Sequence, residues 1–339
     1  MMISHRKWKH LQIALYRDVS FQNKTTGFEK YEFIHNALPE LNYHEISTET
    51  QFLGKRLSFP LMISPMTGGC SKAVKINQQL GETAAECQIA LSLGSQRQLI
   101  ENEKYVESYR IARQVNPNGV IIGNIGAAQL VNWKDTAPFQ KMIDVIQADA
   151  LTIHLNPLQE VLQLEGDVNF KGALSGIERL VKHSTIPIIV KEVGSGISQD
   201  VAERLAQVGV KWIDVAGAGG TSWAAVESFR TSKKKLAKCF WDWGIPTAES
   251  IQMGRDVLGV QMIASGGISD GVTMAKAIGL GATLCGIALP VLKILHKKKK
   301  RGLINYINQL KTEFRTTLFL TGCANVSDLK KKDVIMSCY

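Results

Sequence analysis

Residues 261–289, with the sequence QMIASGGISDGVTMAKAIGLGATLCGIAL, contain the pattern that decides the fold. Two short apolar runs, Gln261–Gly267 and Thr283–Leu289, flank a segment whose apolar residues have helical spacing, Val272–Leu280. Apolar runs with little alternation are typical of strands that are buried on both faces of a parallel sheet. Since a helix separates the two runs, the stretch predicts a strand–helix–strand unit with parallel strands.

The same pattern repeats through the preceding part of the chain. Eight strand–helix alternations over roughly 250 residues match a (β/α)₈ TIM barrel, in the α/β class. An open doubly wound sheet is the alternative, but no G-x-G-x-x-G follows the first strand. The other strands are expected at Phe59–Met66, Ile89–Ser95, Val120–Gly126, Ala148–Asn156, Ile186–Gly194 and Val210–Gly217, and the other clear helices at Ile76–Cys87, Val106–Val115, Phe139–Ile146, Ile177–His183 and Val201–Val208.

We expect a single domain with three parts. Residues 1–57 form an N-terminal extension over the barrel mouth, and residues 58–298 form the barrel. Residues 299–339 form a C-terminal helix, at Ile304–Phe319, and a basic tail. The interval 221–260 is long enough to hold extra structure after the sixth strand.

Composition is that of an ordinary globular protein. Hydrophobic residues make up 45% of the 339 positions, which argues against a disordered chain. The longest run without a charge, Ala277–Leu292, is shorter than the roughly 20 residues of a membrane span and contains glycine and proline. Residues 1–15 lack the apolar core of a signal peptide. We therefore expect a cytoplasmic protein, not inserted in a membrane, with its six cysteines reduced.

The formal net charge of +10 comes largely from three runs of cations, Lys233–Lys235, Lys297–Arg301 and Lys330–Lys332. None has interleaved aromatic residues, and no zinc-finger or RNP motif is present, so no nucleic-acid partner is expected. Solvated faces are the simplest interpretation of these runs. A basic protein also suits a small phosphorylated substrate.

The active site of such a barrel lies where the strands end. The first strand ends in SPMTGG, at Ser64–Gly69, and its glycines let the backbone approach a ligand closely. The second ends in GSQR, at Gly94–Arg97, where Arg97 offers a planar fork for a phosphate. The third ends in Gly123 and Asn124. Each of these pieces is equally typical of an ordinary turn.

The fourth strand ends in HLNPLQE, at His154–Glu160, the strongest functional signal in the chain. His154 and Asn156 share a face because strand side chains alternate, and Gln159 and Glu160 follow closely. A lone histidine is more often a core residue, but four functional side chains within seven positions are not a core pattern. This set is poor for zinc, whereas one carboxylate plus substrate phosphates commonly holds Mg²⁺.

The remaining strand ends favour an anionic ligand. Lys191 closes the apolar fifth strand, where an unpaired ammonium would be expensive to bury. An ion pair with Glu192 is disfavoured because adjacent strand residues point to opposite faces. The sixth strand ends in GAGGTSW, at Gly217–Trp223. Glycines at the ends of the seventh and eighth strands are typical of the phosphate site of a barrel.

Together these motifs resemble the type 2 isopentenyl-diphosphate isomerase family. The order and spacing match over about residues 5–325, and the set is far more specific than any one piece. The matching motifs are MTGG at Met66–Gly69, GSQR at Gly94–Arg97, HLNPLQE at His154–Glu160, VKE at Val190–Glu192, GGTSW at Gly219–Trp223 and the basic start RKWKH at Arg6–His10.

The resemblance implies an FMN-dependent enzyme that interconverts isopentenyl diphosphate and dimethylallyl diphosphate. It implies Mg²⁺, reduced FMN, NADPH or another reductant to prime the flavin, and a homo-tetramer or homo-octamer. The implied catalytic residues are Gln159, His154 and Lys191, and Glu160 would meet Mg²⁺. The implied substrate contacts are Arg6, Lys7, Ser95, Gln96, Arg97, His154, Asn156 and Gln159, and the implied FMN contacts are Pro65, Met66, Thr67, Ser95, Asn124, Lys191, Thr221, Gly267, Ile268, Ser269, Ala288 and Leu289.

The implied chemistry agrees with the residues. An unactivated double bond moves when one carbon gains a proton and another loses one, through a carbocation-like state. An anionic reduced flavin would supply electron density, and Lys191 would stabilise that anion. We hypothesise that flavin N5 delivers the proton while Gln159 positions the substrate or relays a proton. Arg6, Lys7, Arg97, His154 and Mg²⁺ would hold the diphosphate.

Three positions depart from the family pattern. Ser269 stands where the family usually has an arginine that can grip the FMN phosphate, Ala216 replaces a serine, and Leu164 replaces a proline. A lost charge-assisted hydrogen bond costs about 1.5–3 kcal/mol. We therefore expect FMN to bind about 10–100-fold more weakly than with an arginine at this position.

Two other functions are possible. A different FMN barrel is the nearest, but a 2-hydroxy-acid oxidase needs a histidine near the sixth and seventh strands, and an inosine-monophosphate-dehydrogenase-like enzyme needs a cysteine within 215–223. Neither residue is present in those stretches. A non-catalytic barrel that binds phosphate or nucleic acid would leave Gln159, Glu160 and Lys191 unexplained.

Overall fold

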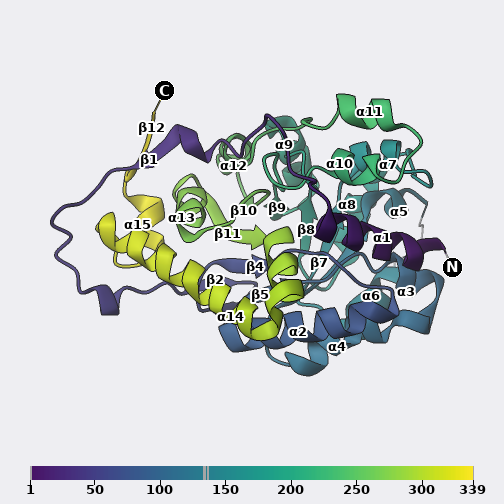
Figure 1. Ribbon diagram of the computed structural model, residues 1–339, viewed down its shortest axis with the longest axis horizontal. Coiled ribbons are helices and arrows are strands. Elements are labelled where there is room, and N and C mark those ends of the chain that lie inside the picture. Colours follow the sequence, from purple (N-terminus) through teal and green to yellow (C-terminus); the bar gives the residue numbers. More distant parts are fainter. Residues whose placement is uncertain (1, 133–134, 136, 339) are drawn as a thin grey trace.

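A closed barrel of eight parallel strands forms the centre of the molecule, as the sequence predicts. The computed structural model describes residues 2–132, 135 and 137–338. The first barrel strand, β4, pairs with β5 on one side and with the last barrel strand, β11, on the other, which closes the ring (Figure 1). The strands are β4 (Leu61–Ile63), β5 (Ala90–Ser92), β6 (Ile121–Gly126), β7 (Ala150–His154), β8 (Ile188–Lys191), β9 (Trp212–Asp214), β10 (Gln261–Ser265) and β11 (Ala282–Ile287).

Helices alternate with these strands around the outside, and each helix expected from apolar spacing is present. Their bounds differ from the expected ones by a few residues because first turns are often polar. Ser198, for example, caps α9 by accepting a hydrogen bond from the N–H of Val201 at 3.4 Å. The helices are α2 (Ser71–Cys87), α4 (Glu107–Val115), α6 (Ala137–Ile146), α8 (Ala173–His183), α9 (Gln199–Gln207), α12 (Thr247–Arg255) and α13 (Gly271–Gly279).

Shorter elements decorate this frame. The interval 221–260 holds α10, α11 and α12, which confirms that it carries extra structure. The N-terminal extension begins with a helix, α1, and later forms a hairpin of two strands, β2 and β3. Within the described residues, no helix combines the length and apolar character needed to cross a membrane. The shorter elements are α1 (Met2–Tyr16), β2 (Thr50–Phe52), β3 (Lys55–Leu57), α3 (Arg97–Glu101), α5 (Ala127–Asn132), α7 (Pro157–Leu162), α10 (Trp223–Ser228), α11 (Lys234–Cys239) and the 3₁₀ turns η1 (Phe28–Lys30), η2 (Tyr43–Glu45) and η3 (Glu103–Tyr105).

The C-terminal region differs from the expected helix and tail. One long helix, α14 (Leu289–Leu320), contains the expected helix and crosses the expected boundary at residue 299. Its backbone is non-helical at Lys299, where φ is 57°, inside the basic run. The expected tail forms α15 (Val326–Lys331) and a strand, β12 (Ile335–Ser337). Figure 1 shows β12, in yellow, beside β1 (Tyr31–Phe33) of the N-terminal extension, and the two strands pair antiparallel.

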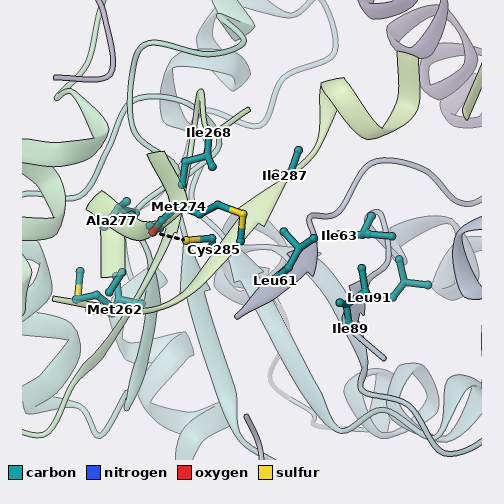
Figure 2. Packing of buried hydrophobic residues seen from close by; sticks show 14 of the residues in the cluster. Leu61, Ile63, Ile89, Leu91, Met262, Ile268, Met274, Ala277, Cys285 and Ile287 are labelled. Atoms are coloured by element: carbon teal, nitrogen blue, oxygen red, sulfur yellow. Dashed lines mark hydrogen bonds between the residues drawn. The ribbon is translucent and has the colours of Figure 1, made fainter. Parts of the chain in front are cut away.

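Alternation along each strand divides the core into two parts. Outward side chains such as Leu61 and Ile63 pack beneath the helices, and Figure 2 shows them with Met274 and Cys285 in the larger cluster. Burial raises the pKa of the Cys285 thiol, whose Sγ lies 3.6 Å from the carbonyl oxygen of Met274. Inward side chains form a separate cluster that the hairpin residues Phe52 and Leu57 close from below, namely Met62, Ala90, Val120, Ile122, Ala150, Ile189, Ile263 and Leu284.

Candidate active site

The inward-facing positions change from apolar to polar toward the mouth of the barrel. Because side chains alternate, the residue two positions after an inward apolar residue also faces inward. On seven strands this residue is polar and buried. Three side-chain atoms of these residues, Ser64 Oγ, Ser92 Oγ and Asp214 Oδ2, have no hydrogen-bond partner among the described residues. We call the full set the polar layer: Ser64, Ser92, Asn124, Thr152, Lys191, Asp214 and Ser265.

Glycines shape a cradle beside this layer. Gly266 and Gly267 have positive φ values of 103° and 76°, which glycine adopts without strain. A Cβ on Gly267 would lie 2.3 Å from Thr26 Cγ2, so the cradle has no space for a side chain there. No hydrogen bond joins the N–H groups of Gly267, Ile268 and Ser269 to any described residue. Donors in such a turn, just before the N-terminus of α13, favour a phosphate.

Ser269 and Ile268 do not contribute side chains to this cradle. Ile268 is buried in the outer core cluster, so only its backbone is available to a ligand. Ser269 Oγ lies 3.4 Å from Asp270 Oδ2, and its carbonyl accepts a hydrogen bond from the Tyr306 hydroxyl at 2.8 Å. The position that carries arginine in the family therefore supplies no cation here.

The short helix α7 brings Asn156, Gln159 and Glu160 together, as the sequence predicts. Pro157 begins the helix, and all three side chains are buried. Asn156 Nδ2 donates to Gln159 Oε1 at 3.1 Å and to Glu160 Oε1 at 2.8 Å. The other carboxylate oxygen of Glu160 accepts from the N–H of Asp167 at 2.7 Å. Asn156 Oδ1 has no hydrogen-bond partner among the described residues.

Glu160 is a single carboxylate. Within the described residues, no group of three or more His, Cys, Asp or Glu side chains could hold a metal ion. Glu160 with its neighbouring amides is a donor set that suits Mg²⁺ only when substrate phosphates complete the coordination.

His154 is held as a neutral imidazole. Its Nδ1 lies 2.8 Å from Asn124 Oδ1, so Nδ1 carries the hydrogen and Nε2 keeps its lone pair. Burial, and then the charges of Lys191 and Lys7, lower the pKa of His154 to about 3. Asn124, itself part of the polar layer, thus links the histidine to that layer.

A buried carboxylate that the sequence did not reveal lies next to Gln159. Glu227, on α10, is fully buried, and its Oε1 lies 3.5 Å from Gln159 Nε2 and 2.8 Å from His10 Nε2. Its Oε2 accepts from Arg230 Nη1 at 2.7 Å. Burial would raise the pKa of Glu227, but His10 and Arg230 outweigh that effect and hold it below the usual value. Burial lowers the pKa of His10.

The N-terminal helix α1 supplies cations to the mouth. Lys7 donates to the carbonyl of Ser95, and its Nζ lies 3.0 Å from the Tyr109 hydroxyl. Burial lowers the pKa of Arg6, and the nearby charge of Arg97 lowers it further. The structure therefore brings Arg6 and Lys7 of α1 close to Arg97 at the end of the second barrel strand, as expected. The mutual repulsion of these cations favours an anion between them.

The other expected site residues at the mouth differ in how buried they are and in whether their polar atoms are already hydrogen-bonded. Thr67 Oγ1 is buried and has no hydrogen-bond partner among the described residues. Thr221 forms an isolated β-bridge with Ser20. The Gln96 amide is fully buried: it donates to the Met142 carbonyl at 3.0 Å and accepts from the N–H of Asn124 at 3.1 Å. Pro65, Met66, Ala288 and Leu289 are partly exposed at the strand ends.

Lys191 and Glu192 do not pair through their charged groups. The Glu192 carboxylate accepts from the N–H groups of Val193, Gly194 and Ser195. Burial raises the pKa of Glu192 to about 7 against the opposing effect of these donors. Lys191 Nζ instead donates to the Glu192 carbonyl at 2.6 Å and lies 3.6 Å from Asp214 Oδ2.

Comparison with known proteins assigns the sequence to a family. Residues 1–150 and 155–336 match the family described as FMN-dependent dehydrogenase. The chain is 45% identical over 336 residues to a Methanothermobacter thermautotrophicus protein named isopentenyl-diphosphate delta-isomerase, covering 99% of this chain and 94% of that protein. A Nostoc protein of the same name is 44% identical over 329 residues, covering 96% of this chain and 93% of its own length.

Solved structures of other enzymes share the fold. Pediococcus acidilactici lactate oxidase superposes with a TM-score of 0.73 at 14% identity, covering 100% of this chain and 95% of its own. A flavocytochrome b2 variant with pyruvate bound superposes with a TM-score of 0.70 at 16% identity, covering 96% and 82%. At such low identity the likeness concerns the architecture alone.

Proposed function

The chain belongs to the FMN-dependent dehydrogenase family and, within it, to the isopentenyl-diphosphate delta-isomerases, and we propose that its barrel mouth works with reduced FMN and Mg²⁺. It is an isomerase that interconverts isopentenyl diphosphate and dimethylallyl diphosphate. The observation that carries the proposed mechanism is the contact between the Gln159 amide and the buried Glu227 carboxylate, next to a cluster of cations.

The mouth residues fit FMN. The glycine cradle, with the N–H groups of Gly267, Ile268 and Ser269, would hold the phosphate, and the polar layer below would face the ring system. When bound in its reduced form, FMN supplies electron density that stabilises a carbocation-like state. Lys191 places a positive charge at the layer, which would favour the anionic form of the flavin.

The diphosphate of the substrate would lie between α1 and the fourth strand end. Arg6, Lys7 and Arg97 contribute positive charge, and the diphosphate would relieve the repulsion that lowers the pKa of Arg6. His154 is neutral before substrate arrives because its pKa is about 3. An adjacent diphosphate raises the pKa of an imidazole, so we expect His154 to take up a proton when the substrate binds and then to donate from Nε2.

Glu160 would hold Mg²⁺ jointly with the diphosphate. Oε1 accepts a hydrogen bond from Asn156, and Oε2 accepts from the N–H of Asp167 and from the Gln163 amide. The carboxylate is therefore fixed in place, and Oε1 retains a lone pair for the metal. Because it is the lone acidic ligand, Mg²⁺ binding should depend on the substrate.

Gln159 would position the reacting carbons and connect them to Glu227. Isomerisation needs a proton added at one carbon and removed at another, so a group that holds a proton must lie within reach of both. The Glu227 carboxylate is ionised and buried, and the Gln159 amide lies between it and the mouth. We infer that Glu227 accepts the proton released from the substrate, with Gln159 fixing the geometry.

The test is an anaerobic assay of the purified protein with isopentenyl diphosphate, FMN, Mg²⁺ and a reductant such as NADPH, omitting each component in turn. The proposal expects dimethylallyl diphosphate to form only when reduced FMN and Mg²⁺ are both present. Product without flavin reduction would overturn the role of reduced FMN, and product without Mg²⁺ would overturn that of Glu160. Cytoplasmic location, homo-oligomeric assembly and NADPH as the natural reductant stay predictions.

A further inference from the structure

Three residues of the mouth form a row across adjacent strands. His154 on β7 is in register with Lys191 on β8, and Lys191 is in register with Asp214 on β9. Lys191 and Asp214 are 6% and 0% exposed, so an ammonium and a carboxylate are buried side by side. Water cannot compensate either charge at such burial, and each must be stabilised by the protein.

The carboxylate of Asp214 is anchored through one oxygen. Oδ1 accepts from the Ser265 hydroxyl at 2.6 Å and from the N–H of Ala216 at 3.1 Å. Oδ2 has no hydrogen-bond partner among the described residues and lies 3.6 Å from Lys191 Nζ. The anchoring leaves the second oxygen near the lysine ammonium, so β9 and β10 set the position of the carboxylate against which Lys191 is held.

Asp214 is the acidic partner that the structure gives to Lys191. The adjacent Glu192 carboxylate is occupied by three backbone N–H groups, and only its carbonyl accepts from Nζ, at 2.6 Å. Without Asp214, the buried ammonium of Lys191 would be left with a single neutral acceptor, the carbonyl oxygen of Glu192. Burial would then favour loss of its proton or rotation toward solvent.

We propose that Asp214 is a positioning residue that acts through Lys191: it keeps the lysine charged and fixed at the mouth, and so determines how strongly the site prefers the reduced cofactor. The inference rests on the proposed use of reduced FMN. Asp214 itself lies beside Lys191 in the polar layer, and its direct effect on an anionic ligand would be repulsive. The two roles therefore predict shifts of opposite sign when the carboxylate is neutralised.

The experiment compares the affinities of oxidised and reduced FMN in the wild type and in Asp214→Asn, which keeps the shape and the Oδ1 acceptor. The proposal expects reduced FMN to bind about tenfold more weakly while oxidised FMN changes by less than threefold. We call the affinity for reduced FMN divided by that for oxidised FMN the redox affinity ratio. A tenfold fall in this ratio lowers the two-electron midpoint potential of bound flavin by about 30 mV. Tighter binding of reduced FMN would overturn the proposal in favour of direct repulsion by Asp214.

Two controls separate positioning from a merely structural role. In a Lys191→Met background, Asp214→Asn should no longer weaken the binding of reduced FMN relative to oxidised FMN, because only the direct repulsion by Asp214 is then removed. That double variant replaces a buried ion pair by a neutral pair, which proteins tolerate. Ser265→Ala keeps the charge and loosens the anchor, so it should shift the ratio in the same direction by twofold to threefold. Equal weakening of both redox states in Asp214→Asn would indicate a structural role and refute the inference.

Failure of this inference can be told from failure of the proposed function. If the wild type binds FMN in neither redox state, the proposed function fails and the inference falls with it. If the wild type binds FMN and Asp214→Asn leaves the ratio unchanged, the inference alone is refuted.

Discussion

The two ends of the barrel use buried polar groups in opposite ways. At the closed end, Arg113 donates to the carbonyls of Ile146 at 3.0 Å and Gly119 at 2.9 Å, and pairs with Asp149 at 2.8 Å. Lys55 of the hairpin adds a second ion pair to Asp149, at 2.6 Å. These contacts join loop carbonyls that the strands leave free, so the polar groups there serve to close the structure.

At the mouth, more buried polar atoms are left without partners than at the closed end, where Asn116 Nδ2 also has none among the described residues. Thr67 Oγ1, Asn156 Oδ1 and Asp214 Oδ2 are buried and accept no hydrogen bond from a described residue. An unsatisfied buried polar atom costs about 1–3 kcal/mol. The contrast teaches that one end of the barrel stabilises the fold, whereas the other holds groups that become satisfied when ligands bind. Variants at each end should therefore separate stability from activity.

The largest effect is expected at the mouth. Gln159→Ala should lower kcat for isomerisation by about 10²–10⁴-fold, because the substrate would be misplaced relative to Glu227 and the contribution of that proton acceptor would be lost, with little change in thermal stability. Val161→Ala, on the exposed face of the same helix, is the matched control and should keep full activity. Steady-state assays at saturating FMN measure both. A fall of less than fivefold in Gln159→Ala would contradict the assigned role.

The closed end should show the reverse behaviour. Arg113→Ala removes a buried ion pair and several bonds to carbonyls, so it should lower the free energy of unfolding by about 3–5 kcal/mol. The folded fraction should keep its kcat. Urea unfolding followed by circular dichroism measures the change, and Arg113→Lys, which keeps the charge without the planar fork, should be intermediate. A loss below about 1 kcal/mol, within the range of an exposed ion pair, would break the comparison.

A variant with tighter FMN binding at the glycine cradle would sharpen the comparison between the two ends of the barrel. Ser269→Arg should tighten FMN binding by about 10–100-fold, because one charge-assisted bond to the phosphate is worth about 1.5–3 kcal/mol. Ser269→Gln adds length without charge and should change the affinity little. Fluorescence titration of the apoprotein with FMN compares the three. Equal Kd values for wild type and Ser269→Arg would show that the cradle needs no cation.

The smallest effect concerns pH. The pKa of His154 is about 3 in the folded protein and about 6.5 in an unfolded chain. Below about pH 6.5, His154 is therefore protonated in the unfolded state but not in the folded state. The free energy of unfolding falls as the pH drops through this range. Between pH 7 and 4.5, wild type should lose about 2 kcal/mol more than His154→Gln. Denaturant unfolding at both pH values tests this, and His35→Gln, at an exposed site, should behave like wild type.

The barrel was predictable because its signal is local and repeated. Each strand is a short apolar run, and each helix has its own spacing, so the order of elements could be obtained without knowing any long-range contact. Lys191 and the His154–Glu160 stretch were predictable for a related reason: functional residues stand out where an apolar strand ends. Because side chains alternate along a strand, the position of the inward apolar residue then determines which of these polar residues face inward.

The rest depended on contacts between distant segments. Glu227 follows no strand directly, and its meaning comes from His10 and Gln159, which are far away in the sequence. Asp214 and Ser265 are ordinary residues in sequence, and counting two positions from the inward apolar residue could have found them. The kink at Lys299 and the strand β12 were missed because a run of lysines has no periodicity that marks a helix or a strand end.

The pairing of β1 with β12 has a consequence for vectorial synthesis on the ribosome. Tyr31 pairs with Ser337, so the earlier strand stays unpaired until residue 337 has emerged from the ribosome. The ring has the same property, since β4 completes its pairing only when β11 appears. A nascent or prematurely terminated chain therefore exposes an unpaired strand edge, the feature that promotes aggregation. The β1–β12 pair is completed last, after β11 has closed the ring.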